Sequence, residues 1–180
     1  MKEKMVLQTI VAVLFLTVGS VSGYFLVRDA VRRHSADAAR IIRIGDPAPD
    51  FSTKDDAGRR ISLSDHRGKS VFLHFWATWC QPCAEEAPVI DALRKTLPER
   101  NFQFVMISLD TQWSAVKEFK QQHNVGFPVY LDPGRKVADL YSVYALPVTF
   151  LIDGNGVIVK RILGPNDWSS FQEGRLFTHE

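Results

Sequence analysis

The stretch WATWCQPCAEEAP, residues 76–88, holds both cysteines of this 180-residue chain, Cys80 and Cys83. The run SVFLHFWA, residues 70–77, leads into this stretch and is almost wholly apolar, as suits a strand buried on both faces. After it, to about residue 97, apolar residues recur at the spacing of one helix face. The two cysteines are therefore predicted to lie where a central strand passes into a helix.

That position determines what the two thiols can do. A thiol at the start of a helix lies beside unpaired backbone N–H groups and the positive end of the helix dipole, which stabilise its thiolate. Cys80 has that position, and Cys83, one turn further on the same face, can close a small disulfide with it. Pro82 is tolerated between them because an N–H in the first turn has no helical partner. We expect a redox-active Cys80–Cys83 pair in which Cys80 attacks and Cys83 resolves.

The remaining pattern predicts one α/β domain over residues 44–180. The DGNG sequence indicates a tight hairpin turn, and DDAGRR indicates a second one nearer the start of the domain. Alternating strands and helices favour a parallel sheet covered by helices, which here ends in an antiparallel pair. Further strands are predicted in 101–110, 148–153 and 157–164, and helices in 111–125, in 136–144 and near the N-cap candidate Asp167.

An apolar segment precedes this domain. Residues 5–27 carry no charged side chain, and a helix of that length, about 34 Å, would cross a hydrocarbon core of about 30 Å. We predict that residues 1–27 form a membrane anchor that is not cleaved, because the apolar run continues past the possible signal-peptidase site at residues 21–23. Residues 28–43 are predicted to be a linker. By the positive-inside rule, the arginines of this linker favour a cytoplasmic location for the domain and so argue against an extracytoplasmic one.

Composition and spacing disfavour several classes of function. A net charge of +2 without long basic runs gives no argument for a nucleic-acid partner. A structural zinc site needs four ligands, and the five histidines show no paired spacing. A purely structural disulfide is a weaker alternative, because so short a loop removes little chain entropy. We expect no cofactor. The alternative function is a metallochaperone for oxidase assembly, with Cu(I) held by the thiolates of Cys80 and Cys83.

Three separated motifs resemble the membrane-anchored thioredoxin-like proteins of the TlpA, ResA and CcmG type, which are related to the AhpC/TSA and Redoxin proteins. The motifs are IGDPAPDF, VFLHFWATWCQPCAEEAP and FPVYLDPGRKVADLYSVYALPVTFLIDGNGVIV, in that order. The resemblance covers about residues 44–163 and implies a thioredoxin fold with a central mixed β-sheet flanked by helices. A peroxidase is disfavoured, because peroxiredoxins carry a Pro and a Thr shortly ahead of the reactive cysteine, whereas here Thr78 and Trp79 precede Cys80 and no such proline is present.

The resemblance also implies an activity and a place in the cell. It implies a thiol:disulfide oxidoreductase tethered by a single span to a bacterial cytoplasmic membrane, with its catalytic domain on the periplasmic or extracytoplasmic side. Expected substrates are disulfide-containing proteins, such as apocytochrome c or proteins with copper-site cysteines. Electrons are expected from a transmembrane thiol reductase.

The resemblance also implies a substrate-binding surface. Leu146–Pro147 matches the family's cis-proline turn, which lies against the active-site disulfide and offers backbone groups to an extended substrate. A cis X–Pro bond would expose the C=O and N–H of Leu146 to a peptide strand, whereas a trans proline would only begin the next strand. Trp79, Gln81 and Pro82 are the other predicted substrate-binding residues.

Two further residues are candidates for proton transfer. His74 lies six residues before Cys80, where thioredoxin has a buried carboxylate and the anchored relatives often have Asn. It could relay the proton that Cys83 must lose, or be a core histidine held by one hydrogen bond. Glu86 matches an acidic residue that ResA-like members place beside their cysteines. A partly buried carboxylate there would have a raised pKa and could shuttle protons.

Overall fold

A computed structural model describes residues 42–171 of the chain. The predicted anchor, residues 5–27, and nearly all of the predicted linker lie outside this range. No helix within residues 42–171 combines the length and the apolar character that a membrane crossing requires.

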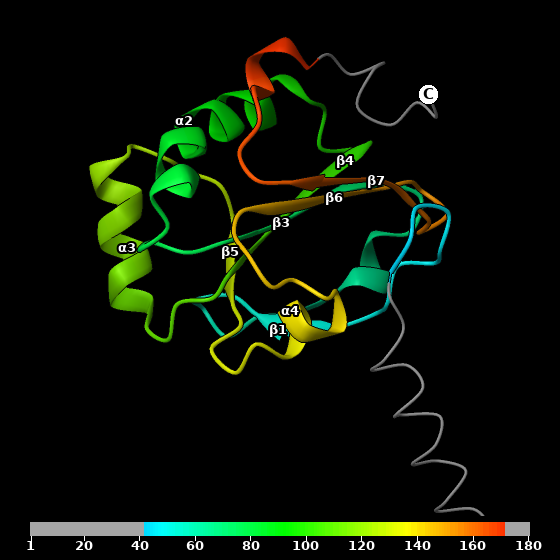
Figure 1. Cartoon of the computed structure of the whole chain (residues 1–180), viewed down its shortest axis with the longest axis horizontal. Coiled ribbons are helices and arrows are strands. Elements are labelled where there is room, and N and C mark those ends of the chain that lie inside the picture. Colours follow the sequence, from blue (N-terminus) through cyan, green and yellow to red (C-terminus); the bar gives the residue numbers. More distant parts are fainter. Residues whose placement is uncertain (1–41, 172–180) are drawn as a thin grey trace, which may run out of the picture. The chain divides into compact units, whose positions relative to one another are not determined.

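The described chain alternates strands with helices (Figure 1). The strands are β1 (Ser52–Lys54), β2 (Arg60–Ser62), β3 (Ser70–Trp76), β4 (Phe102–Ser108), β5 (Val129–Leu131), β6 (Val148–Ile152) and β7 (Ile158–Leu163). The helices are α2 (Gln81–Thr96), α3 (Trp113–Gln122) and α4 (Lys136–Leu140), with two 3-10 helices, η1 (Leu63–His66) and η2 (Trp168–Ser170).

The main sheet has the strand order β5-β4-β3-β6-β7, and β1 and β2 form a separate hairpin. β3, β4 and β5 are parallel, whereas β6 is antiparallel to both of its neighbours, β3 and β7. Every residue of β3 from Val71 to Trp76 is buried, as a central strand covered on both faces requires. The mixed sheet with an antiparallel final pair is confirmed.

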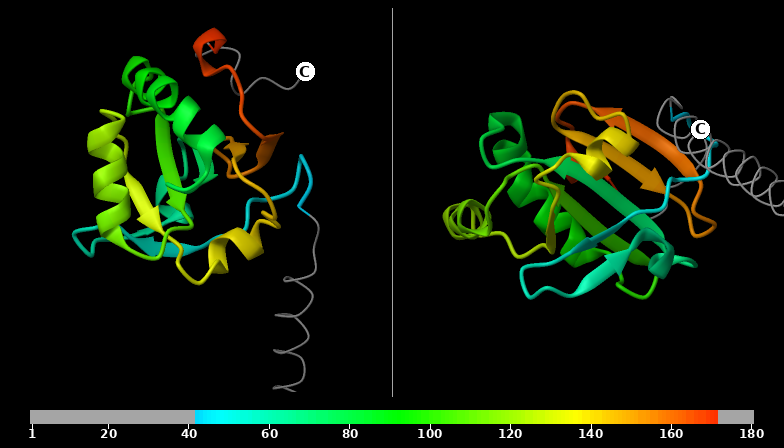
Figure 2. Two further views of the ribbon diagram at one scale, coloured as in Figure 1. Left: turned by 60° about the vertical axis from the view of Figure 1, so that its left-hand side comes forward. Right: turned by 90° about the horizontal axis from the view of Figure 1, so that it is seen from below.

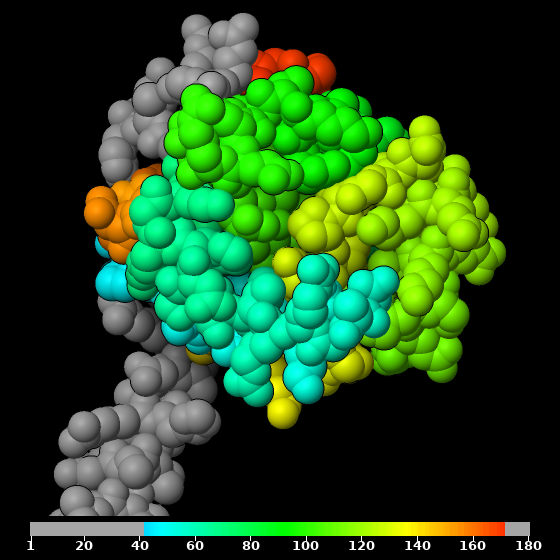
Figure 3. Space-filling view, turned by 180° about the vertical axis from the view of Figure 1, so that it is seen from behind, coloured from blue at the N-terminus to red at the C-terminus, as the bar shows by residue number. Residues whose placement is uncertain are grey.

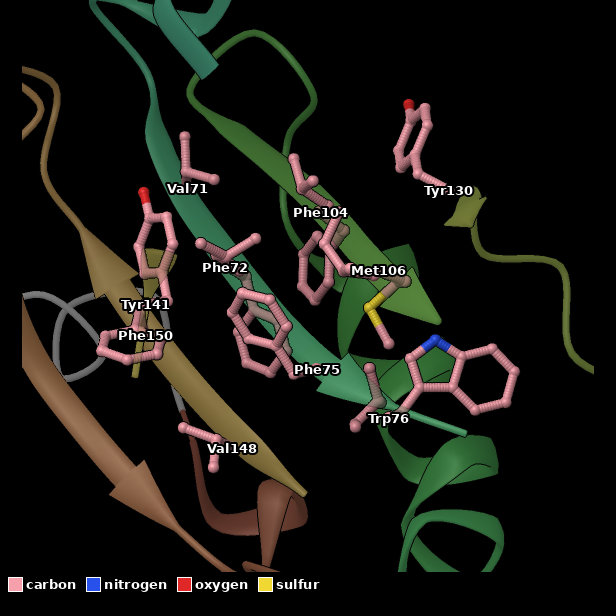
Figure 4. Close-up of a cluster of buried hydrophobic side chains, with 14 of the residues drawn as sticks. Val71, Phe72, Phe75, Trp76, Phe104, Met106, Tyr130, Tyr141, Val148 and Phe150 are labelled. Carbon is pink, nitrogen blue, oxygen red and sulfur yellow. The ribbon is translucent and has the colours of Figure 1, made fainter. Parts of the chain in front are cut away.

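Side chains along β3 alternate between the two faces of the sheet. On one face Trp76 packs against Phe119 of α3, with ring centroids 4.8 Å apart. On the other face Phe75 packs against Tyr141, just after α4, at 5.6 Å. Helices α2 and α3 therefore cover one face, and α4 with the β1–β2 hairpin covers the other (Figure 2). Figure 4 shows buried hydrophobic side chains, many of them aromatic, gathered around β3, β4 and β6.

Seen from behind, the connection between β1 and β2 lies beside α3 (Figure 3). A hollow of about 520 Å³ between them is lined by Asp55, Arg59 and Lys117, among others. Neither cysteine lines this hollow, so it lies apart from the expected redox chemistry.

Three elements differ from the sequence-based expectation. β5 was not predicted, because a three-residue edge strand between Pro128 and Pro133 is too short to show a period. α4 ends at Leu140 instead of near residue 144, since Ser142 has a left-handed φ of 51° that a helix cannot continue through. Up to Phe171, where the described residues end, the predicted last helix is a three-residue 3-10 turn, and its predicted cap is confirmed because Asp167 accepts a hydrogen bond from the N–H of Ser169.

Candidate active site

Cys80 and Cys83 form a disulfide at the junction of β3 and α2, with their Cα atoms 5.3 Å apart. Cys80 is the N-cap residue of α2, and Cys83 lies in the first turn. Cys80 is 7% exposed and Cys83 1%. A partner sulfur can therefore approach Cys80 more easily than Cys83, which its own helix screens.

The turn that leads to Cys80 is fixed by a buried carboxylate at the end of β4. Asp110 Oδ2 accepts hydrogen bonds from the Thr78 backbone N–H at 3.0 Å and from the Ser108 hydroxyl at 2.6 Å. Its other oxygen, Oδ1, accepts from the Thr78 hydroxyl at 2.7 Å. β3 and β4 are parallel, so their carboxyl ends meet at the same edge of the sheet. Sequence reasoning did not find Asp110.

The predicted substrate-binding residues next to the disulfide reach the surface. Trp79 is 68% exposed, Gln81 is exposed and Pro82 is half-buried. A groove of about 600 Å³ opens beside Trp79 and is lined by Thr78, Trp79, Gln81, Ala84, Glu85, Pro88 and His123. An aromatic side chain with so much exposed surface beside a reactive sulfur offers contact area to a docking partner.

The peptide bond between Leu146 and Pro147 is cis, as expected. Pro147 is buried and its carbonyl accepts a hydrogen bond from Gly164 N–H at 2.9 Å. Leu146 is half-buried and packs against the core, while Tyr144, two residues earlier, is 87% exposed. The loop before β6 therefore presents an exposed aromatic ring followed by the cis-proline turn.

His74 lies in the middle of β3 and is 1% exposed. Its Nδ1 is 2.9 Å from the hydroxyl of Thr149, the residue opposite it on β6. Burial lowers the pKa of His74 to about 3, because the imidazolium form would lose its hydration. The imidazole is therefore neutral near pH 7.

Glu86 is the second buried ionisable group of the site and is 5% exposed. Its Oε2 accepts hydrogen bonds from the Trp168 indole N–H at 2.7 Å and from Asn166 N–H at 3.2 Å. Its Oε1 has no hydrogen-bond partner among the described residues and faces His74 Nε2 at 3.4 Å. Burial raises the pKa of Glu86 to about 7, although the two hydrogen bonds act to lower it. The carboxyl can thus gain or lose a proton near neutral pH.

The structure brings His74 and Glu86 together and adds partners that sequence reasoning missed. These partners are Thr149, Asn166 and Trp168, none of which the sequence marked as a candidate site residue. The hydrogen-bonded pairs are 75 to 82 residues apart in the chain, so no local spacing could reveal them. The one available signal was a His and a Thr, each inside an otherwise apolar strand.

The described residues include no group of three or more His, Cys, Asp or Glu side chains that could hold a metal ion. The two sulfurs form the disulfide, and Cys83 and Glu86 are buried residues three apart on α2.

Known proteins that resemble this chain include thiol-disulfide oxidoreductases. The model of the AhpC/TSA family matches residues 44–161. Thiol-disulfide oxidoreductase ResA of a Bacillus cereus strain is 42% identical over 123 residues, which are 68% of this chain and 71% of that protein. ResA of Bacillus subtilis (strain 168) is 42% identical over 120 residues, 67% of each chain.

Solved structures agree with these relatives. StoA from Bacillus subtilis matches with a TM-score of 0.59 and 28% identity, over 69% of this chain and 93% of that one. A thiol:disulfide interchange protein of the thioredoxin family from Chlorobium tepidum TLS matches with a TM-score of 0.61 and 29% identity, over 71% and 91%. With a Cys-x-x-Cys disulfide at the start of α2, the chain belongs to the AhpC/TSA family and is a thioredoxin-like thiol-disulfide oxidoreductase of the TlpA, ResA and CcmG type.

Proposed function

We propose that this oxidoreductase reduces disulfides in partner proteins outside the cytoplasm. The observation that carries the proposal is the asymmetry of the disulfide: Cys80 caps α2 and is the more exposed cysteine, while Cys83 is screened and shares a helix face with Glu86. This arrangement suits one attacking thiolate and one thiol that must lose a proton later.

The reaction proceeds in two exchanges. The Cys80 thiolate attacks one sulfur of the partner disulfide, forming a mixed disulfide and releasing the other partner sulfur as a thiolate. Cys83, once deprotonated, attacks Cys80 Sγ, which forms the Cys80–Cys83 disulfide and releases the second partner sulfur. Two electrons pass from the dithiol to the partner, and the partner thiolates take up protons.

In this mechanism Glu86 takes the proton from Cys83. The two residues are three apart on α2 and both are buried, so they are neighbours on one face. A carboxyl that titrates near pH 7 is well matched to accept a proton at physiological pH.

His74 assists Glu86 as a neutral relay. When Glu86 is ionised, His74 Nε2–H can donate to its Oε1, and the Thr149 hydroxyl can donate to Nδ1. When Oε1 carries the proton, the Oε1–H group donates a hydrogen bond to Nε2 of the other neutral tautomer, whose Nδ1–H donates to Thr149. The Thr149 hydroxyl, both donor and acceptor, accommodates either tautomer.

The proposed cellular setting rests on the apolar N-terminal segment and on the family resemblance of the sequence motifs. Residues 5–27 anchor the protein in a bacterial cytoplasmic membrane, and the thioredoxin-like domain works on the extracytoplasmic side. Its substrates are proteins whose cysteines must stay reduced, such as the haem-binding cysteines of apocytochrome c or the cysteines of copper sites. A transmembrane thiol reductase restores the dithiol. The apolar length of the segment supports the anchor.

The redox state of Cys80 and Cys83 in growing cells tests whether the protein reduces its partners or oxidises them. Acid quenching followed by thiol alkylation separates the dithiol from the disulfide on a gel. We expect mostly dithiol, converted to disulfide when the transmembrane reductase is deleted. A pair that is oxidised in unperturbed cells would contradict the reductive role, although not the exchange chemistry.

A further inference from the structure

A segment near the C-terminal end of the described chain reaches over α2 and contacts the buried acid. Asn166 and Trp168 both donate hydrogen bonds to Glu86, and both bonds end on the same oxygen, Oε2. The 3-10 helix η2, which begins at Trp168, packs against α2. Oε2 of Glu86 therefore accepts two hydrogen bonds, and Oε1 faces His74 Nε2.

This division of the two oxygens determines where a proton can sit. An oxygen that already accepts two N–H donors has no room for a proton of its own, so protonation takes place on Oε1. Oε1 faces His74 Nε2 from β3, and Cys83, three residues before Glu86 on α2, becomes a titratable group once the disulfide is reduced. Asp167, on the same segment as the two donors, is exposed and accepts from Ser169 instead.

We propose that Trp168 is a positioning residue for thiol–disulfide exchange: its indole N–H stabilises the ionised Glu86 carboxylate and directs the proton to Oε1, toward His74. This inference rests on the proposed role of Glu86 as the group that receives the Cys83 proton. Without the indole donor, the buried carboxylate would lose its shorter hydrogen bond and would hold a proton to higher pH.

Packing and hydrogen bonding of Trp168 can be separated experimentally. The side chain is 1% exposed, and its ring contacts Phe72 and Phe171 at centroid distances of 4.9 Å and 5.1 Å. Trp168→Phe keeps an aromatic ring at this position and removes the N–H donor. Trp113 on α3 also packs against the core and lines the 520 Å³ hollow, which neither cysteine lines, so Trp113→Phe is the matched control.

The experiment titrates Glu86 in the full oxidised chain by carbon-13 NMR of labelled glutamate carboxyl groups, with the Glu86 signal assigned by its loss in Glu86→Gln. A hydrogen bond to a charged acceptor is strong enough that its removal should raise the midpoint by about one pH unit or more. We expect this rise in Trp168→Phe and no rise in Trp113→Phe. An unchanged midpoint in Trp168→Phe, or an equal rise in both variants, would overturn the inference.

Two additions keep the test decisive. If Trp168→Phe does not fold, the indole can be replaced with benzothiophene, which keeps the ring shape and lacks the N–H, and the same rise is expected. The resolution rate of Glu86→Gln, measured beside Glu85→Gln, tests the proposed function separately. A raised midpoint in Trp168→Phe with a normal resolution rate in Glu86→Gln would support the positioning of Glu86 and overturn its role as proton acceptor.

Discussion

At the scale of single residues, His74 and Glu86 give the folded state opposite pH dependences. The pKa of His74 is lowered from 6.5 to about 3, so the unfolded chain binds the extra proton between these values, and stability is lost as the pH falls below about 6.5. The pKa of Glu86 is raised from 4.5 to about 7. The folded chain binds the extra proton here, and stability is lost as the pH rises from about 4.5 through 7.

Between about pH 4.5 and 6.5 the two contributions cancel in the wild-type protein, and single substitutions should separate them. We expect the unfolding free energy of His74→Asn to fall with rising pH up to about 7, and that of Glu86→Gln to fall with decreasing pH below about 6.5. Urea unfolding of the oxidised protein across pH measures both, and exposed Glu85→Gln should follow wild type. Identical profiles in all four proteins would show that neither buried group titrates as described.

The relay role of His74 predicts a kinetic defect confined to the second exchange. His74→Asn should leave the attack by Cys80 nearly intact, because the start of α2 stabilises that thiolate. Resolution by Cys83 should slow, since general acid–base catalysis typically contributes on the order of 10²-fold and even a partial relay is visible. Stopped-flow measurement should show mixed disulfide accumulating. An unchanged resolution rate and pH profile would make His74 a packing residue held by Thr149.

At the scale of secondary-structure elements, the Asp110 carboxylate at the end of β4 holds the turn between β3 and α2 through its hydrogen bonds to Thr78. Asp110→Asn places an amide N–H₂ against donors of Thr78 or Ser108. We expect the unfolding free energy to drop by about 1–3 kcal/mol, the usual cost of leaving a buried polar group unpaired. The first attack by Cys80 should slow as well, because the turn that carries it is less fixed.

Exposed Asp139 on α4 provides the control for that substitution. Its side chain is 64% exposed and lies 3.5 Å from Arg135, so Asp139→Asn should change stability by less than about 0.5 kcal/mol. Equal losses in the two variants would mean that Asp110 has no special role in holding the turn.

The sequence predicted those elements whose residues alone show a characteristic pattern. The apolar run of β3, the periodic face of α2 and the DGNG turn each follow from local physics, so the strand–helix junction and both cysteines were predicted correctly. β5 was missed, because its pairing with β4 and not its three residues makes it a strand. The hydrogen bonds from Asn166 and Trp168 to Glu86 were missed because these residues lie 80 and 82 positions away from Glu86 in the chain, where no local pattern can reveal them.

At the scale of the whole molecule, the proposal places the thioredoxin-like domain outside the cytoplasm. Alkaline phosphatase fused after Glu180 should be active, because it folds only where disulfides form. The arginines that follow residue 27 favour the opposite orientation. An inactive fusion, together with activity of a reporter that works only in the cytoplasm, would show that these arginines determine the topology.

The central claim is that Cys80 attacks a partner disulfide and Cys83 resolves it, and trapping tests this most directly. The full chain is expressed as Cys83→Ala or as Cys80→Ala, cells are quenched in acid, and mixed disulfides are separated on non-reducing gels. The account predicts partner proteins linked through Cys80 in Cys83→Ala and almost none in Cys80→Ala, because Cys83 is screened by α2. Equal trapping in the two variants, or adducts formed through Cys83 alone, would contradict it.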